Sequence, residues 1–544
     1  MISAPLWFAA TGPILLLLAG ILPRAVTSRF PVASIRLALA AALASLLVAI
    51  GTAVAVAGHG ALRTNLVGSH GLGLGLYLDA LSATMSVLVA FVGVIVVNYS
   101  RNYLDGDPNH VRFVRWLCLT LASILVAIIS GNLLLFFAAW YATSLRLHRL
   151  LLFYPERQGA LLAARKKWLA SRLGDLCLVV AMGLLYFTHG SLDYAVVFAG
   201  TADAAASGSL PASHAAVAVL LVFAALLKSA QFPTHGWLIE VMETPTPVSA
   251  LLHAGIINAG GFLVLRFAGL ITPCAAALDT LAIVGGFSAL FGSMAMLTQT
   301  SIKVSLAYST IAQMGFMMLE CGLGAFPAAL LHIVAHSLYK AHAFLSSGSV
   351  IDIARASWTP SPGGKPHPAR VTISVAAVML VTLVVSIACG ASPRQQPGVF
   401  ALGMVVSLGM IHLLANAIDE RPTPYVIGRT VVLAAVVAGV YFTLQLGFER
   451  LVGGSLPRRQ PLHGVFELLI VVSMVLSFGA VTVFQNLLPG AGAPPRWEPI
   501  YAHVSNGLYV NTLANRWVLW FWPPPPAPRT ATPSWMPRRP GVGG

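Results

Sequence analysis

Runs of mostly apolar residues, each about as long as a membrane helix, follow one another along this 544-residue sequence. A helix needs about 20 such residues to cross the hydrocarbon core of a bilayer. Only helices and closed barrels satisfy their backbone polar groups in lipid. We therefore predict an all-α polytopic membrane protein with about 14–16 transmembrane helices. Their expected centres lie near residues 14, 46, 89, 121, 142, 179, 222, 258, 286, 312, 336, 381, 407, 437 and 474.

Composition supports this fold class and narrows the function. Hydrophobic residues make up 57% of the chain and charged residues 9%, against roughly 25% charged in soluble proteins. The net charge of +15 fits basic cytoplasmic loops better than nucleic-acid binding. Five isolated cysteines, with no CxxC, dinucleotide or P-loop motif, lead us to expect no cofactor, no metal and no redox or hydrolytic site.

Basic residues alternate between successive loops. They gather after the predicted first, third and fifth helices, which places the N-terminus outside and the C-terminus in the cytoplasm; only Arg458 and Arg459 depart from this pattern. We divide the chain into N-terminal transmembrane helices (1–75), a core that carries the ionisable residues (76–350), shortened C-terminal helices (351–488) and a Pro/Trp/Arg-rich tail (489–544). The tail is expected to be interfacial or partly disordered, with a short surface helix between Tyr501 and Trp522.

Lys228 ends a long apolar run and is followed five residues later by Pro233. Proline interrupts helical hydrogen bonding, and broken helices inside a membrane can line a hydrated cavity. An ionisable side chain in such a place is a functional candidate by default. The alternative is a lysine with no role in transport, whose long side chain reaches the membrane–water interface.

His332, His336 and Lys340 are spaced four residues apart and so share one helical face. Imidazoles titrate near physiological pH, which suits a proton relay. Half of a zinc site or a stripe of core histidines would show the same spacing.

Further ionisable residues are less distinctive. His253 follows Pro245 and Pro247, which predict a helix start. A local ion pair is predicted for Arg172 and Asp175 from their spacing of three. Lys303 and Asp79 open predicted spans, where each could act as an interfacial anchor.

Two long motifs carry a family resemblance. Lys228–Leu238 with Glu243–His253, and Ile302–Gly315 with the His332/His336/Lys340 helix, resemble the antiporter-like subunits of respiratory complex I and Mrp antiporters. The resemblance implies two inverted five-helix repeats with broken helices. It also implies a proton relay through Lys228, His253, Lys303, His332, His336 and Lys340, supported by Arg172 and Asp175.

The chain departs from that family at informative positions. Trp140–Tyr141 stands where the family has tryptophan followed by glutamate, so Tyr141 is the candidate substitute for the lost carboxylate. The family's second broken-helix lysine has no clear match, with only Arg394, His412 or Asp419 nearby. The long lateral helix of the complex I subunit is also absent from the pattern.

The shortened second half and the tail 501–516 resemble the DabB-type membrane subunits of the DAB inorganic-carbon accumulation complex. That resemblance implies a bacterial inner-membrane subunit whose cation flux, with protons as the expected ion, is coupled to CO2 hydration. The implied partner is a DabA-like zinc protein related to carbonic anhydrases. The alternatives are a proton-pumping subunit of a NADH–quinone oxidoreductase or membrane hydrogenase, and a Mrp-type Na+/H+ antiporter subunit. A further alternative is a stand-alone metal-dependent membrane enzyme, which is disfavoured because the sequence shows no set of metal ligands.

Overall fold

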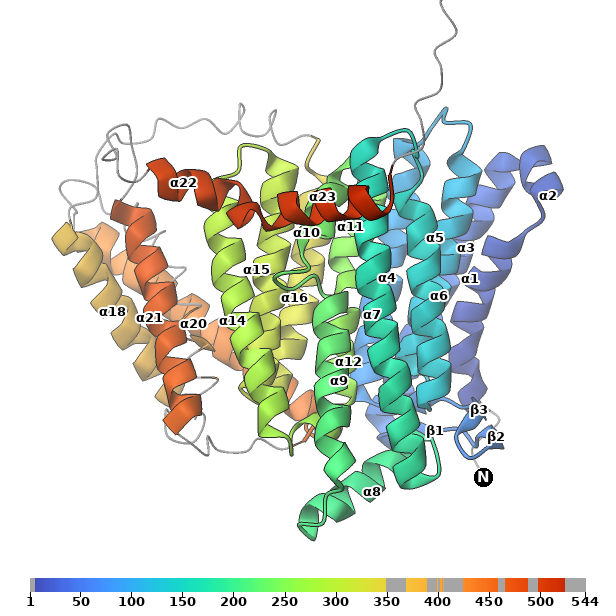
Figure 1. Ribbon diagram of the computed structural model, residues 1–544, viewed down its shortest axis with the longest axis horizontal. Helices are drawn as coiled ribbons and strands as arrows, with labels where there is room; N and C mark the ends of the chain where they lie inside the picture. Colours follow the sequence, from blue (N-terminus) through green and yellow to red (C-terminus); the bar gives the residue numbers. More distant parts are fainter. Residues whose placement is uncertain are drawn as a thin grey trace, which may run out of the picture.

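The computed structural model describes residues 5–348, 368–388, 399, 402–403, 405, 424–457, 465–487 and 498–523. The described part is a bundle of long, roughly parallel helices (Figure 1). Seven segments of it are long and apolar enough to cross a membrane: Pro31–His59, Ala80–Tyr103, His110–Ile129, Gln158–His189, Thr246–Arg266, Ala275–Leu297 and Val431–Val452. Five shorter apolar helices accompany them. The predicted all-α polytopic membrane fold is confirmed, and the two inverted repeats stay a prediction.

The elements follow one another in a simple order. The first part of the chain forms η1 (Pro5–Ala10), α1 (Thr11–Ile21), α2 (Arg24–Arg29), α3 (Pro31–His59), α4 (Ala80–Tyr103), α5 (His110–Ile129), α6 (Leu133–Leu151), α7 (Gln158–His189), α8 (Tyr194–Ala206) and α9 (Ala212–Lys228). The middle part forms α10 (Gly236–Glu240), η2 (Val241–Glu243), α11 (Thr246–Ala254), η3 (Ile256–Asn258), α12 (Ala259–Arg266), α13 (Ala268–Ile271), α14 (Ala275–Leu297), α15 (Ile302–Gly322) and α16 (Phe326–Leu345). The last described helices are α18 (Pro368–Ala388), α20 (Pro424–Val452), α21 (Val465–Leu487), α22 (Glu498–Ser505), η5 (Gly507–Tyr509) and α23 (Val510–Phe521). Every predicted helix centre falls in one of these segments except residue 407, which lies outside the described residues.

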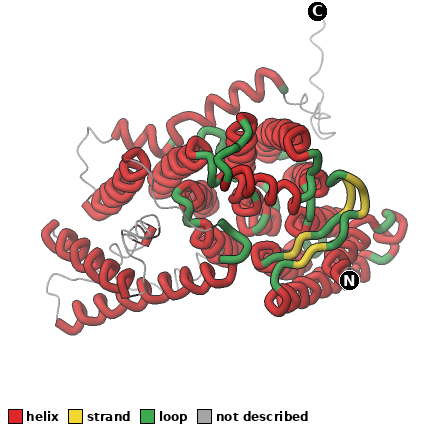
Figure 2. The backbone as a smooth tube through the Cα atoms, turned by 90° about the horizontal axis from the view of Figure 1, so that it is seen from below, coloured by secondary structure: helices red, strands yellow, loops and turns green. Residues whose placement is uncertain are grey.

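Four short strands connect α3 to α4. Strand β1 (Leu62–Arg63) pairs with β4 (Tyr77–Leu78), and β2 (Val67–Ser69) pairs with β3 (Leu72–Leu74), both antiparallel. Figure 2 shows these strands together at one edge of the bundle, next to the N-terminus. They cover the end of the bundle at which α4 begins.

Two helices are broken beside one another. Helix α9 stops at Lys228, and the chain becomes helical again at Gly236. The next span stops at Ala254, passes through η3 and resumes as α12. A side chain at Gly260 would collide with the Ala225 carbonyl oxygen at 2.4 Å, so glycine lets α12 approach the end of α9. The break predicted from Pro233 and the helix start predicted from Pro245 are both confirmed.

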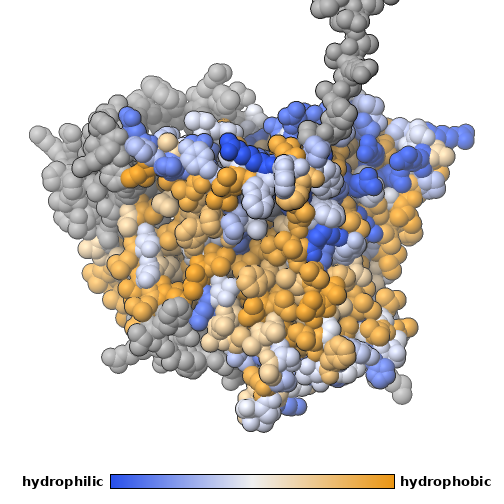
Figure 3. Space-filling model, viewed as in Figure 1, coloured by the Kyte–Doolittle hydropathy of each residue, from blue (hydrophilic) through white to orange (hydrophobic). Residues whose placement is uncertain are grey.

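The basic loops lie on one face of the bundle. In Figure 1, α2 and the strap of α22 and α23 lie at the top, opposite the N-terminus, the strands and α8. Figure 3 shows hydrophilic surface along this upper face and an apolar band below it. The alternation of basic loops along the sequence therefore corresponds to one side of the fold.

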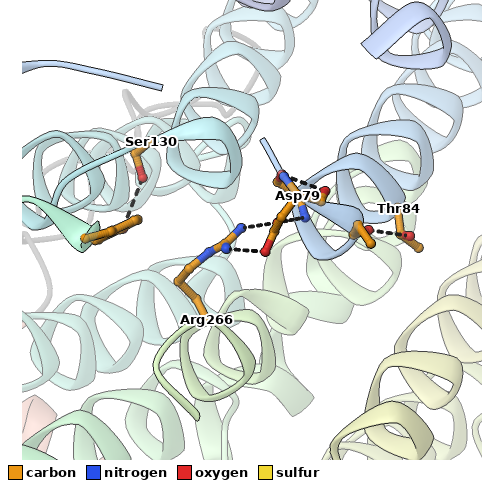
Figure 4. A network of polar contacts seen from close by, with 7 residues as sticks. Asp79, Thr84, Ser130 and Arg266 are labelled. Atoms are coloured by element: carbon orange, nitrogen blue, oxygen red, sulfur yellow. Dashed lines mark hydrogen bonds and ion pairs between the residues drawn. The ribbon is translucent and has the colours of Figure 1, made fainter. Parts of the chain in front are cut away.

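A buried ion pair joins α4 to α12. Asp79 caps α4 by accepting a hydrogen bond from the Ser82 amide at 2.9 Å. Its two carboxylate oxygens also accept hydrogen bonds from Arg266 at 2.8 and 3.0 Å (Figure 4). The side chains of Asp79 and Arg266 are only 1% and 2% exposed. Asp79 is thus a buried structural partner and not the interfacial anchor that its position in the sequence predicted.

We expect Asp79→Asn to destabilise the fold strongly. The asparagine oxygen can still cap α4, but Arg266 would be left as a buried charge without a counter-charge, at a cost of about 3–5 kcal/mol. The thermal unfolding midpoint of the purified protein in detergent should fall accordingly. The double variant Asp79→Asn/Arg266→Met should recover much of the loss; a double variant as unstable as the single one would contradict this account.

Candidate functional site

Lys228 lies at the break of α9 with its ammonium group inside the protein. The residue is buried, and its Nζ is 4.1 Å from the centroid of the Trp140 ring. Within the described residues this nitrogen has no hydrogen-bond partner. It lines a cavity of about 30 Å³ together with Thr143 and Phe262, which is room for about one water molecule. The lysine is therefore held by a cation–π contact and does not snorkel to the surface.

Trp140 connects Lys228 to a carboxylate. While its ring faces the ammonium, its indole N–H donates a hydrogen bond to Asp175 at 2.9 Å. Asp175 is paired with Arg172 at 2.7 Å, which confirms the predicted local ion pair. Both members of the pair interact electrostatically with Lys228. Asp175 attracts the ammonium of Lys228 and Arg172 repels it, so Lys228 has no counter-charge of its own.

Tyr141 does not replace the carboxylate missing from α6. Its ring is 38% exposed and lies 4.2 Å from the guanidinium carbon of Arg172. The phenol therefore supports Arg172 and not Lys228 directly. Within the described residues, Asp175 of α7 is the carboxylate that interacts with Lys228.

Lys166 and Lys167 belong to the basic group that is predicted to form the loop after the fifth helix, and that prediction is wrong because both lie buried in α7. Lys167 donates hydrogen bonds to the carbonyl and hydroxyl oxygens of Ser144 at 2.6 and 2.9 Å. It also interacts electrostatically with Lys228. Lys166 forms an ion pair with Glu240 of α10 at 2.6 Å. Basic residues in a run at a predicted helix end look alike in the sequence. Nothing in the sequence tells which of them are buried and which are exposed.

A second buried group of ionisable side chains surrounds α16. His253 of α11 shares a hydrogen bond of 2.9 Å with the Thr310 hydroxyl and stacks on Phe344. Lys340 is fully buried and donates to the Leu306 carbonyl at 3.1 Å. His253 and Lys340 interact electrostatically, so α11 and α16 bring two of the predicted relay residues together.

His332 and His336 continue this group along α16. Their ring centroids are 6.3 Å apart. His332 contacts Glu320 of α15 at 3.1 Å, a carboxylate that no motif in the sequence marks. Both ring nitrogens of His336 lack a hydrogen-bond partner within the described residues, although His336 interacts electrostatically with Lys340 and His253. The described residues contain no group of three or more His, Cys, Asp or Glu side chains suited to a metal ion.

Polar side chains at the helix breaks connect the two groups. The Ser229 hydroxyl donates to the Ile257 carbonyl at 2.9 Å. The neighbouring Asn258 donates to the Ser337 hydroxyl of α16 at 2.7 Å. This link runs partly through backbone, and Lys228 itself takes no part in it. A proton would need water, or movement of a side chain, to pass from Lys228 to His336.

Two further features lie at the two ends of this series of ionisable side chains. Lys303, in the first turn of α15, is half-buried and reaches the Thr246 hydroxyl at 3.4 Å. At the other edge a cavity of about 620 Å³ opens between α15, α16, α20 and α21. Glu320, His332 and His336 line it, so water in this cavity would reach the histidines.

Comparisons with known proteins agree with this architecture. Residues 130–359 match the family model of the NADH:quinone oxidoreductase/Mrp antiporter transmembrane region, and residues 65–114 match that of the N-terminus of complex I chain 5. The "probable inorganic carbon transporter subunit DabB2" of Halothiobacillus neapolitanus is 40% identical over 83% of this chain and 81% of its own length. The corresponding DabB of Hydrogenovibrio crunogenus is 47% identical over 51% of this chain and 53% of its own.

Solved structures show the same fold at low sequence identity. The Mrp complex of a Dietzia species aligns with a TM-score of 0.57 and 23% identity, covering 95% of this chain and 57% of that one. An archaeal membrane-bound sulfane sulfur reductase aligns with a TM-score of 0.59 and 17% identity, covering 93% and 99% of the two chains.

We expect Lys228→Met to stabilise the protein. The change removes a buried ammonium that lacks a hydrogen bond and leaves an apolar side chain against Trp140, a gain of about 1–3 kcal/mol. Lys166→Met is the matched control and should destabilise, because it leaves Glu240 without its ion pair. Thermal unfolding in detergent measures both; a lower midpoint for Lys228→Met would show that the cation–π contact with Trp140 outweighs the missing hydrogen bond.

Proposed function

Because this chain belongs to the DabB family of inorganic carbon transporter subunits, we propose that it is the cation-conducting membrane subunit of an energy-coupled complex for inorganic carbon accumulation. The partner would be a DabA-like zinc protein that hydrates CO2 to bicarbonate. The membrane subunit would supply the ion flux and hold no catalytic site of its own. It would lie in a bacterial inner membrane with the basic face of the bundle in the cytoplasm.

The observation that carries this proposal is the buried ammonium of Lys228 at a helix break. A charge at such a position is costly, which makes it a functional candidate. Asp175 and Arg172 sit close enough to influence it electrostatically, and Lys167 adds a second amine nearby. Of these groups, Lys228 lines the cavity of about 30 Å³, and a water molecule entering it would be the partner for proton exchange.

The chemistry of the relay favours a proton over sodium. Hard cations such as Na+ bind to oxygen ligands, whereas amines and imidazoles bind protons. The groups that lie between the helix breaks and the large cavity are His253, Lys340, His336 and His332. A path lined with such basic groups repels a sodium ion but can pass a proton from one nitrogen to the next.

The membrane potential is a sufficient energy source for this coupling. Moving one charge across the membrane yields about 2.3 kcal/mol per 100 mV. Proton flow through this subunit would make hydration of CO2 on the cytoplasmic side effectively one-way. Bicarbonate is charged and therefore stays inside.

The alternative is a proton-pumping subunit of a quinone oxidoreductase. The NAD(P)H-quinone oxidoreductase chain 5 of Synechocystis is 40% identical over 52% of this chain and 42% of its own length. The absence of a glutamate beside Trp140 argues against this assignment. Co-purification with a zinc protein supports the first proposal, and co-purification with quinone-reductase subunits supports the second.

Lys228→Met should abolish inorganic carbon accumulation without loss of assembly. Co-expressed with its partner, the wild-type chain is expected to restore growth in air to a bacterium that lacks carbonic anhydrase, and the variant is not, because the proton carrier at the break is gone. Arg36→Met, at an exposed position of α3, is the matched control and should rescue growth fully. Full rescue by Lys228→Met would remove the relay from the mechanism.

His336→Leu should block voltage-driven proton flux. In vesicles that contain the complete complex, a potassium diffusion potential and an internal pH dye report proton entry directly. The leucine fills a similar volume but cannot carry a proton between His332 and Lys340. His59→Leu, at an exposed site, should leave the flux unchanged. Equal flux through both variants, or flux that requires sodium, would exclude this path.

A further inference from the structure

The C-terminal helices form a strap across the bundle. In Figure 1, α22 and α23 run nearly at right angles to the long helices and pass in front of α15, α10 and α7. Figure 2, turned by 90°, shows them along the outer edge of the bundle. The strap therefore lies at the side of the protein, at the level of its basic face.

The inner face of α23 is polar and binds α10. Asn511 and Asn515 donate hydrogen bonds to the same oxygen of Glu240, at 3.1 and 2.7 Å. The other oxygen of Glu240 pairs with Lys166 at 2.6 Å, and Lys166 also donates to Asn511. Asn511 and Asn515, one helical turn apart, therefore hold the carboxylate of Glu240. Glu240 ends α10, the short helix that follows the break at Lys228.

Polar contacts also hold the strap at the end of α23 and at the end of α22. Arg165 donates to the carbonyls of Trp522 and Pro523, and its guanidinium lies 4.8 Å from the Trp522 ring centroid. Near the middle of the strap, where α22 ends, Gln299 donates to the Ser505 carbonyl at 3.1 Å. Polar contacts therefore hold α23 against the bundle, and the buried Val518 adds one apolar contact on its inner face.

The outer face of α23 is apolar and aromatic. Leu513, Trp517, Trp520 and Phe521 are 54%, 68%, 77% and 69% exposed. Their spacing of four, three and one puts them on one side of the helix, opposite the two asparagines. A helix with its polar face towards the protein and its aromatic face outward needs an apolar or interfacial environment on the outside.

The surroundings of this face are those of a lipid boundary. On the neighbouring α7, Leu169, Leu173 and Leu176 are exposed and continue away from the basic end of the bundle. Figure 3 shows the hydrophobic band below the strap, interrupted there by one hydrophilic patch. Tryptophan and tyrosine concentrate at the headgroup level of membranes, and Arg516 on α23 can meet lipid phosphates there.

We propose that α23 docks on the bilayer itself, with its aromatic face among the lipid headgroups and upper acyl chains while Asn511 and Asn515 hold Glu240. The strap would then tie α10, the helix that follows the break at Lys228, to the membrane surface. The same outer face would not be the binding site of the catalytic partner. This inference is independent of which ion the protein conducts.

Spin labels on the full chain test the proposal. With the native cysteines replaced, single cysteines at 513, 517, 520 and, facing inward, 518 are labelled in vesicles of phosphatidylethanolamine and phosphatidylglycerol. Labels at the three outer positions should be reached by oxygen, which dissolves in lipid, and not by a water-soluble nickel chelate. The label at 518 should be shielded from both. Access of the nickel chelate to 517 and 520 would overturn the proposal, as would loss of oxygen access on adding the partner subunit, which would identify a protein occupant.

The asparagine clamp is tested in the same vesicles. Asn511→Ala/Asn515→Ala should free the strap, so that the label at 517 becomes more mobile and its contrast between oxygen and nickel is lost. Asn506→Ala is the matched control, because Asn506 donates only to the Ala502 carbonyl of its own segment. An unchanged spectrum in the double variant would show that the asparagines do not hold α23.

Discussion

A charge inside this bundle must be neutralised by protein, because lipid offers no partner. The described residues contain four buried or half-buried ion pairs: Asp79–Arg266, Lys166–Glu240, Arg172–Asp175 and His332–Glu320. Each carboxylate in them is already engaged. Among the described residues, Lys228, Lys340 and His336 are left without a carboxylate of their own, so no salt bridge fixes a proton on them.

The same electrostatic argument applies to α6, which has tyrosine after Trp140 where the resembling family has glutamate. A carboxylate next to Trp140 would place a counter-charge beside the ammonium of Lys228. Here the indole of Trp140 separates the ammonium from Asp175, and Tyr141 is turned to Arg172. Aromatic rings attract a cation without forming a salt bridge. The site therefore holds the ammonium of Lys228 without a direct salt bridge, as the proposed proton carrier would require.

The sequence predicted what local chemistry determines and missed what packing determines. Apolar runs located the helices, Pro233 and Pro245 located the breaks, and a spacing of three predicted Arg172–Asp175. Arg266 pairs with Asp79 from 187 residues away, and no periodicity marks such a pair. In the sequence, Glu320 and Lys166 resemble ordinary charged residues of loops or helix ends. Their partners become apparent only in the fold, where α15 packs against α16 and α7 packs against α10.

The break in α9 connects these features because the segments on either side of it contact residues that are far away in the sequence. On one side Ser229 and the adjacent η3 lead to Asn258 and Ser337 on α16. On the other side α10 ends in Glu240, which α23 holds. A membrane-seated strap would fix α10 while leaving the unwound residues between Lys228 and Gly236 free to admit water. The freedom of Lys228 to exchange its proton would then depend on a fixed frame built from segments almost 300 residues apart.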